Sequence, residues 1–241
     1  MTHKMNTLVL TLLLGSALTG SARAEPASDV SFSFRAITWS DAPLAGLTIP
    51  TAGNPLVIDA PVNQRSRAYE YRGDPTVEIY PGKDMTDASP VGQFVAGPNW
   101  SQVLLFLLPN PRGGDVKVFA MDDSLSAFPP DTVRFVNLSG KTIAGFLGNQ
   151  KVVLENMDDK QLSAAGGAAF LPIRFAESSS EQGGWKRFLS SAVGVNKGMR
   201  TLIVFYPGSA DNQRTGKEIC YKLFYDYPAT SSSVVAGNTQ R

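Results

Sequence analysis

One stretch of the chain, residues 103–138, most constrains what it can fold into. Two apolar runs, 103–108 and 116–121, flank a turn rich in proline and glycine. A third apolar run, 133–138, follows the corner Phe128-Pro129-Pro130-Asp131. Short apolar runs separated by such turns are typical of antiparallel strands. The stretch therefore predicts an all-β protein, and it contains no catalytic motif.

The run 103–108 is apolar at every position, so both faces of a strand at this place would be apolar. This pattern predicts a central strand with a neighbour on each side. In a sandwich, one face of the strand points into the core and the other needs separate cover. A second domain or a partner could provide that cover.

Strand patterns continue on both sides of this stretch. Before it, the alternation in 31–39 predicts a half-buried strand, and further strands are expected at 56–58, 67–72, 76–80 and 93–96. After the corner, seven strands are expected, and this density of strands and turns predicts an immunoglobulin-like sandwich. Residues 158–165 favour at most one helical turn. The seven expected strands are 133–138, 142–147, 151–154, 168–175, 185–190, 200–206 and 218–227.

The chain begins with the pattern of a signal peptide. A short basic segment precedes an apolar core at 8–18, and Ala22-Arg23-Ala24 is a small-x-small cleavage site. We predict a signal peptide over 1–24, a β-sandwich domain over 25–123, an immunoglobulin-like β-sandwich domain over 124–228 and a disordered tail over 229–241. Cleavage near Ala24 would place the protein in the periplasm or outside the cell. No run is long enough for a transmembrane span.

Composition narrows the function classes. Without residues 1–24 the chain holds 20 basic and 21 acidic residues, so no basic surface for nucleic acid is expected. The only histidine, His3, lies in the predicted signal peptide, which argues against a Ser-His-Asp site and a histidine metal site. The only cysteine, Cys220, leaves no partner for an intramolecular disulfide and favours a buried, inert thiol. We expect no cofactor and no metal.

Tryptophan is the residue type most suggestive of a binding surface. Trp100 and Trp185 each lie next to a glycine-containing turn at the start of an expected strand, so both are candidates for ligand or partner contact. The tyrosines at strand spacing are expected in the core instead. They are Tyr69, Tyr71, Tyr221, Tyr225 and Tyr227.

The acidic residues give no specific site. The pairs Asp122-Asp123 and Asp158-Asp159 lack the spacing of a calcium loop and are interpreted as solvated loop acids. The two halves of the chain are not convincing repeats. Residues 76–83 (TVEIYPGK) and 201–209 (TLIVFYPGS) share only a strand that ends in Tyr-Pro-Gly.

Four motifs follow one another in the second half: FPPD at 128–131, TVRFVNLS at 132–139, Trp185, and YPG at 206–208. In this order they resemble uncharacterised exported proteins of Gram-negative bacteria with an immunoglobulin-like β-sandwich, some found with pilus-type surface systems. The resemblance covers residues 100–230. It implies a β-sandwich and a surface role, and it carries over no functional residue.

These observations predict an exported, non-enzymatic protein that acts by protein–protein contact at the cell envelope or surface. The alternative is a carbohydrate-binding module that uses Trp100 and Trp185 as stacking platforms. A third hypothesis is a hydrolase with two carboxylates facing each other across a sugar. An open strand edge could also accept a strand from a partner or from another copy. The donors would be 25–30 or the tail after Pro228.

Overall fold

The structure is a computed structural model that describes residues 29–40, 42–110, 113–164, 169–179 and 184–228. Within this part it contains sixteen strands and one short helix, α1 (Ala210–Arg214), which confirms the predicted all-β class. The predicted signal peptide and the predicted tail lie outside the described residues. In the part described, no helix is long and apolar enough to cross a membrane.

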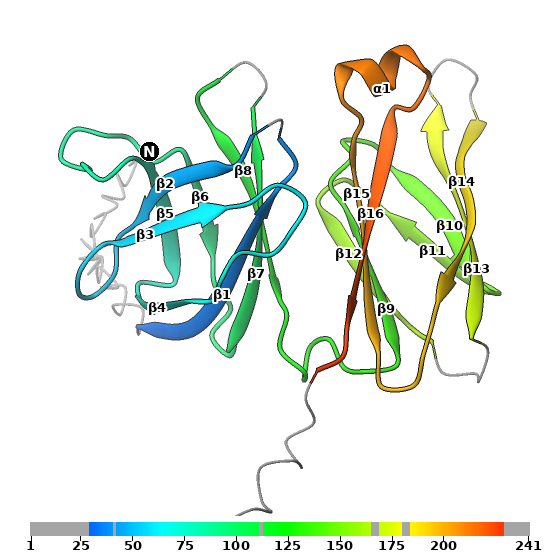
Figure 1. Cartoon of the computed structure of the whole chain (residues 1–241), viewed down its shortest axis with the longest axis horizontal. Coiled ribbons are helices and arrows are strands. Elements are labelled where there is room, and N and C mark those ends of the chain that lie inside the picture. The colour runs from blue at the N-terminus through cyan, green and yellow to red at the C-terminus, as the bar shows by residue number, and fades with distance from the viewer. Residues whose placement is uncertain (1–28, 41, 111–112, 165–168, 180–183, 229–241) are drawn as a thin grey trace, which may run out of the picture.

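The first eight strands form one sandwich, drawn in blue to green (Figure 1). Its sheets have the strand orders β4-β1-β7-β8 and β3-β2-β5-β6. All paired strands are antiparallel except β1 and β7, which run parallel. The strands are β1 (Val30–Thr38), β2 (Leu44–Ile49), β3 (Leu56–Ala60), β4 (Tyr69–Gly73), β5 (Thr76–Pro81), β6 (Gly92–Val95), β7 (Gln102–Pro109) and β8 (Val116–Asp122).

The last eight strands form the second sandwich, with the strand orders β12-β9-β15-β16 and β11-β10-β13-β14. Here β9 and β15 are the parallel pair. The two tandem sandwiches lie side by side (Figure 1). The strands are β9 (Thr132–Asn137), β10 (Ile143–Leu147), β11 (Gln150–Leu154), β12 (Asp158–Ser163), β13 (Phe170–Ser179), β14 (Gly184–Gly194), β15 (Arg200–Pro207) and β16 (Ile219–Asp226).

The two sandwiches have the same topology. Adding eight to every strand number of the first converts both of its sheet orders into those of the second. A local detail repeats as well: Asn63 (φ 57°) and Met157 (φ 65°) both have a left-handed backbone. Their amides donate to the carbonyl oxygens of Thr38 (3.0 Å) and Asn137 (2.7 Å), at corresponding ends of β1 and β9. The fold is therefore duplicated.

The one sequence similarity between the two halves does not reflect this duplication. The similar segments 76–83 and 201–209 contain β5 and β15, which are not equivalent strands, since β5 corresponds to β13 and β7 to β15. Equivalent strands share their place in the sheet order rather than their residues. A short Tyr-Pro-Gly match carries no information about which strands correspond.

The central strand β7 shows how the sandwiches are joined. Val103, Leu105 and Leu107 face the core of the first sandwich. Leu104 and Phe106, on the other face, lie in a different cluster with residues of the second sandwich. The second sandwich thus covers the outer face of β7. Of the two covers considered from the sequence, a second domain or a partner, it is the second domain. We call β4-β1-β7-β8 and β12-β9-β15-β16 the inner sheets, and the other two the outer sheets.

The cluster between the inner sheets is a third core, the middle core. It is buried to the same degree as the cores within the sandwiches. Its buried members are Ile37, Leu104, Phe106, Met121, Phe128, Val136, Leu138, Leu202 and Val204. The molecule is therefore a stack of four sheets with three apolar layers between them.

Trp39 closes one side of the middle core. Its ring stacks on Phe106 of the first sandwich (centroids 5.5 Å apart, planes at 10°) and on Tyr206 of the second (5.2 Å, 21°). Phe224 meets the same ring edge-on at 6.3 Å. Stacked and edge-on ring pairs add to the stabilisation that burial provides.

For the second sandwich, one prediction is wrong and another is not confirmed. Residues 158–163 form the strand β12 and not a helical turn, so there are eight strands where seven were expected. The immunoglobulin-like identity is not confirmed. In the constant-type immunoglobulin arrangement the first two strands share a sheet, whereas β9 and β10 belong to different sheets.

We expect Trp39→Ala to lower the free energy of unfolding by about 3 kcal/mol, because it removes a large ring from the contact between the sandwiches. Urea denaturation followed by circular dichroism measures the change. The control Tyr225→Ala, at a side chain that is 53% exposed, should change it by less than about 0.5 kcal/mol. A Trp39→Ala effect as small as that of the control would contradict the stabilising role of the middle core.

Candidate functional site

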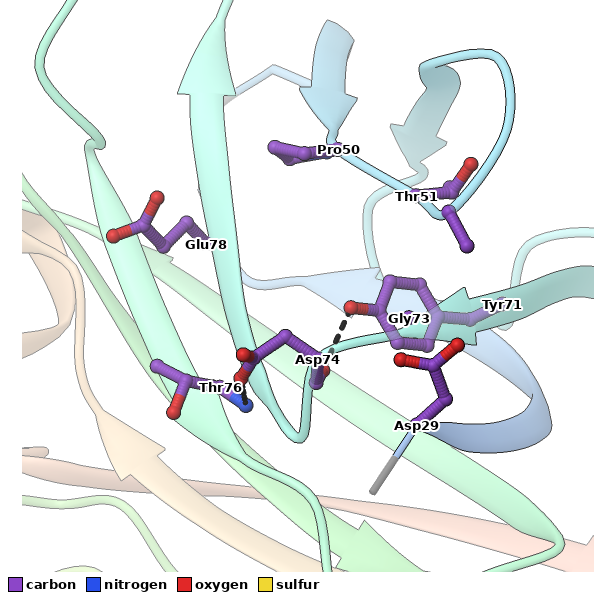
Figure 2. A pocket seen from close by; sticks show the side chains of 9 residues that line it. Asp29, Pro50, Thr51, Tyr71, Gly73, Asp74, Thr76 and Glu78 are labelled. Atoms are coloured by element: carbon purple, nitrogen blue, oxygen red, sulfur yellow. Dashed lines mark hydrogen bonds between the residues drawn. The ribbon is translucent and has the colours of Figure 1, made fainter. Parts of the chain in front are cut away.

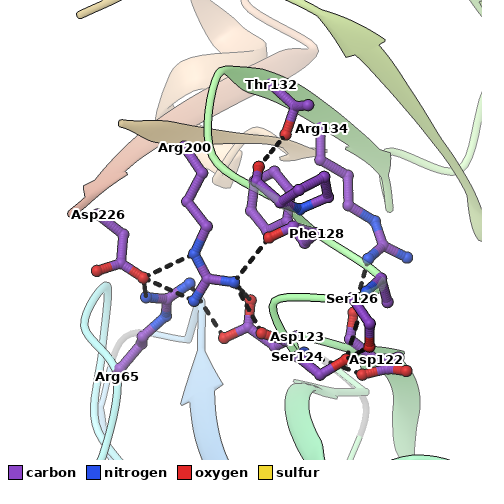
Figure 3. Close-up of polar contacts among 12 residues, drawn as sticks. Arg65, Asp122, Asp123, Ser124, Ser126, Phe128, Thr132, Arg134, Arg200 and Asp226 are labelled. Atoms are coloured by element: carbon purple, nitrogen blue, oxygen red, sulfur yellow. Dashed lines mark hydrogen bonds and ion pairs between the residues drawn. The ribbon is translucent and has the colours of Figure 1, made fainter. Parts of the chain in front are cut away.

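A buried cluster of charged side chains joins the sandwiches beside the middle core (Figure 3). Arg200, which is 5% exposed, donates from Nε to Asp226 Oδ2 at 2.8 Å. Its Nη1 donates to the carbonyl oxygens of Asp123 (2.7 Å) and Phe128 (3.2 Å). Arg65 of the first sandwich lies 3.5 Å from Asp123 Oδ2 and 3.6 Å from Asp226 Oδ2. The cluster thus holds the connecting segment against both sandwiches.

A second arginine contributes to the same connection. Arg134 donates from Nη1 to the carbonyl oxygen of Asp122 (2.7 Å) and from Nε to Asp159 Oδ2 (2.6 Å). The guanidinium groups of Arg200 and Arg134 lie 5.0 Å and 6.0 Å from the centre of the Phe128 ring. The Nε and Nη1 atoms of both arginines donate to protein oxygens, so we interpret this cluster as a structural connection.

Asp123 departs from the prediction that the Asp122-Asp123 pair is solvated. It is 8% exposed, and its Oδ1 is buried without a hydrogen-bond partner. Burial raises the pKa of its carboxyl group, and the charges of Arg65 and Arg200 offset only part of this rise. The sequence showed the acids but not that the chain turns inward at this point, because Arg65, Arg134 and Arg200 come from distant segments.

A second ion cluster lies at one end of the second sandwich. Lys141 Nζ forms ion pairs with Glu177, which is 2% exposed, and with Glu218. Lys186 of β14 lies 3.3 Å from Glu218 and 3.9 Å from Glu177. The hydrogen bonds that Lys141 donates to Glu177 and Glu218 raise the pKa of its ammonium group. Each carboxylate faces an ammonium group, so the cluster does not present two opposed acids of the kind a hydrolase needs.

The first sandwich has a shallow acidic hollow of about 470 Å³ (Figure 2). Asp29, Asp74 and Glu78 line it, together with Tyr71. Tyr71 donates to the carbonyl oxygen of Asp74 (2.8 Å), and burial with the nearby Asp74 and Asp29 charges raises the pKa of its hydroxyl. Glu78 accepts from Tyr80 (2.6 Å). These bonds connect the hydroxyl of Tyr71 and the carboxylate of Glu78 to neighbouring groups of the protein itself.

The outer sheet of the second sandwich presents a different surface. On β10 and β13, Phe146 and Arg174 pair with each other and alternate with core residues, so they point outward. The same row continues to Lys151 on β11. The next row crosses the sheet from Val153 on β11 through Ala144 and Ala176 to Arg187 on β14. Trp185 lies two residues before Arg187 on β14 and pairs with Ser178 of β13. We call Phe146, Lys151, Val153, Arg174, Trp185 and Arg187 the outer basic face.

The outer basic face combines exposed apolar groups with cations that are not ion-paired within the described part of the chain. Phe146 is 45% exposed, Val153 41% and Trp185 56%. Lys151, Arg174 and Arg187 are exposed and form no ion pair with any described carboxylate. The rows that carry these residues, all of them described, contain no acidic side chain. Glu155, which accepts from Thr142 (2.6 Å), stands at the margin.

The two predicted contact tryptophans have different surroundings. Trp185 lies on the outer basic face. Trp100 is half-buried and packs against the core of the first sandwich. A Cβ atom on Gly97 would meet Trp100 Nε1 at 2.6 Å, so glycine is required there. The structure does not bring the two tryptophans together on one face.

The tyrosines divide in the same way. Tyr69 and Tyr71 lie in the first core, as predicted, whereas Tyr221, Tyr225 and Tyr227 are 37%, 53% and 60% exposed. The prediction that the last three are buried is wrong, because Tyr221 and Tyr225 lie on the edge strand β16 and Tyr227 follows its end. Cys220, expected to be buried, is half-exposed, with Asn212 Nδ2 3.5 Å from its sulfur.

Charge is unevenly divided between the halves of the chain. Residues 25–123 hold twelve acidic and seven basic side chains (net −5), and residues 124–241 hold nine acidic and thirteen basic ones (net +4). The near-zero total therefore conceals an acidic first half and a basic second half. No protein-family model matches the chain, and no curated protein matches it.

We expect Arg200→Met to destabilise the protein by about 3 kcal/mol, because Asp226 and two buried carbonyl oxygens lose their donor. Arg200→Lys should recover only part of the loss, since an ammonium group cannot reproduce the planar fork. Thermal denaturation measures both variants, with the exposed Lys197→Met as the control. Equal stability of Arg200→Met and the control would contradict the cluster's role.

We expect Asp123→Asn to change the pH dependence of stability. The folded-state pKa of Asp123 is raised, so its contribution to stability is complete below the unfolded pKa and is lost as the pH rises through the folded value. The wild type should therefore lose stability relative to Asp123→Asn between pH 4 and neutral pH. A stability difference that does not change over this pH range would show that Asp123 ionises in the fold without penalty.

Proposed function

We propose that this protein is an exported, non-enzymatic binding protein that acts by protein–protein contact at the cell envelope or surface, in the periplasm or outside the cell. The observation that supports the proposal is the outer basic face. Its apolar groups can bury area against a partner, and its cations can select one. Arginine and tryptophan are the residue types that contribute most to the affinity of protein interfaces.

The chemistry of the face defines the partner. Lys151, Arg174 and Arg187 form no ion pair with the carboxylates of the described residues, so the partner surface should be acidic, with an apolar patch for Phe146 and Trp185. Like charges that face each other are unfavourable, so basic proteins would be rejected. The signal peptide expected at 1–24 supports the location.

A second function has its own support. Trp185 is 56% exposed beside Arg187, and an exposed indole next to cations suits an acidic glycan as well. Trp100 would not contribute, because it packs against the first core. Binding of the purified protein on a glycan array, lost in Trp185→Ala, would favour this alternative. A flat response would end it.

The proposed protein contact is tested by charge reversal. We expect Arg174→Glu to reduce crosslinking to the envelope partner by about tenfold or more, because it removes one cation and repels an acidic surface. The comparison is made in envelope preparations, with the partner identified by mass spectrometry and its binding then measured with purified components. Lys83→Glu, the same charge change at an exposed turn of the first sandwich, is the matched control.

Two results would contradict the proposal. One is an unchanged complex with Arg174→Glu, which would place the contact elsewhere. The other is the absence of any specific partner in crosslinked envelopes under several growth conditions.

A further inference from the structure

The internal duplication reveals one sheet edge that is covered in the first sandwich and open in the second. In the first sandwich, β6 and β8 are the edge strands on one side. Val116 N donates to Val91 O there at 2.6 Å, and a Cβ atom on Gly92 would lie 2.6 Å from Val116 O. This contact draws the two sheet edges together at Val116.

The equivalent edge strands in the second sandwich are β14 and β16, and they are not joined in this way. Among the described residues, no backbone hydrogen bond connects β14 with β16. Lys186, near the beginning of β14, forms an ion pair with Glu218, which directly precedes β16. On β16, Tyr221 pairs with the core residue Phe205 of β15, and Tyr225 pairs with Thr201. Both tyrosines remain exposed.

The strand β14 is eleven residues long, and β6 is four. The first part of β14 has two features that commonly protect an edge strand from pairing. One is the charge of Lys186 and Arg187, and the other is a bulge where the register with β13 shifts after Phe175. Its second part, residues 189–193, has no charge and no proline, and Ser190, Ser191 and Ala192 are exposed. An exposed edge of this kind binds another strand readily.

We infer that two copies of this chain associate by antiparallel pairing of their β14 strands, centred on Ser191. The second copy is the occupant because the sequence of β14 is compatible with itself in this register. Ser190 then faces Ala192 on the outer side, and Leu189 faces Val193 on the side of the second core, to which both belong. Arg187 faces Val195, so no like charges meet.

The pairing joins the two outer sheets β11-β10-β13-β14 into one continuous sheet across a two-fold axis. It also brings the outer basic faces of both copies onto the same side of that sheet. A partner with two acidic sites would then bind both at once, with the gain that bivalent binding provides. The inference uses the strand edge and not the face, so it does not depend on the proposed function.

Site-specific crosslinking tests the register. In a Cys220→Ser background, Ser191→Cys should form a disulfide-linked dimer on oxidation, because directly opposed Cβ atoms lie close enough for a disulfide. Ser101→Cys, at an exposed position of the first sandwich, is the matched control and should remain monomeric. A mixture of the Ser190→Cys and Ala192→Cys chains should form the mixed dimer in preference to either homodimer.

Sedimentation tests the association itself. The mature wild type should sediment as a dimer, and Ser191→Lys should sediment as a monomer with unchanged circular dichroism, since two ammonium groups would face each other. Arg174→Glu should remain dimeric, which separates this inference from the proposed function. A wild type that is monomeric at about 1 mM, or a dimer that Ser191→Lys does not dissociate and Ser191→Cys does not crosslink, would overturn the inference.

Discussion

Contact between the two inner sheets is the interaction on which the rest of the structure depends. The central strands β7 and β15 of the inner sheets are apolar on both faces, because their residues are buried throughout most of their length. A sandwich alone would expose one of these faces to water, and exposed apolar area of that extent is unfavourable. The middle core removes both faces from water at once, so the two sandwiches stabilise each other.

The ion cluster around Arg200 has a different role from the middle core. Burying charged groups is costly unless they are paired, so such clusters add less to stability than apolar contacts of similar size. They do require specific geometry, since Arg200 must reach Asp226 and two carbonyl oxygens together. The apolar layer thus holds the sandwiches together, and the arginines define their relative orientation.

Duplication of one topology explains how binding surfaces could arise without loss of stability. The two inner sheets are committed to the middle core, which leaves the outer sheets and the edges free to differ. The first sandwich has an acidic hollow around Asp74 and a covered edge at Val91. The second has the outer basic face and the open strand β14. All of these differences lie away from the middle core.

Much of the fold could be predicted from local patterns, because alternation and turn residues determine where strands form. The apolar run at 103–108 indicated that the outer face of β7 needs separate cover, with a second domain or a partner as possible covers. Other features could not be predicted in this way. The strand β12 has the sequence DDKQLS, which lacks a strand pattern because an edge strand needs few apolar residues. Arg65, Arg134 and Arg200 come from distant segments and are brought together only by tertiary contacts.

The candidate sites show the same division. The exposure of Trp185 was foreseen from its place after a turn, whereas Trp100 differs because its ring lies against Gly97 and the first core. The outer basic face could not be predicted from the sequence, because Lys151, Arg174 and Arg187 are far apart along the chain and the total charge is near zero. Only strand register places them in adjacent rows.

Native-state hydrogen exchange of the intact protein tests the central claim, that the four-sheet stack is one cooperative unit, most directly. Amides of β7 and β15 should exchange only through global unfolding, with equal opening free energies and an equal response to low concentrations of denaturant. Exchange of β9–β16 through an opening that leaves β1–β8 protected, or the reverse, would contradict the claim. It would show that the sandwiches fold separately and that the middle core is only a contact between them.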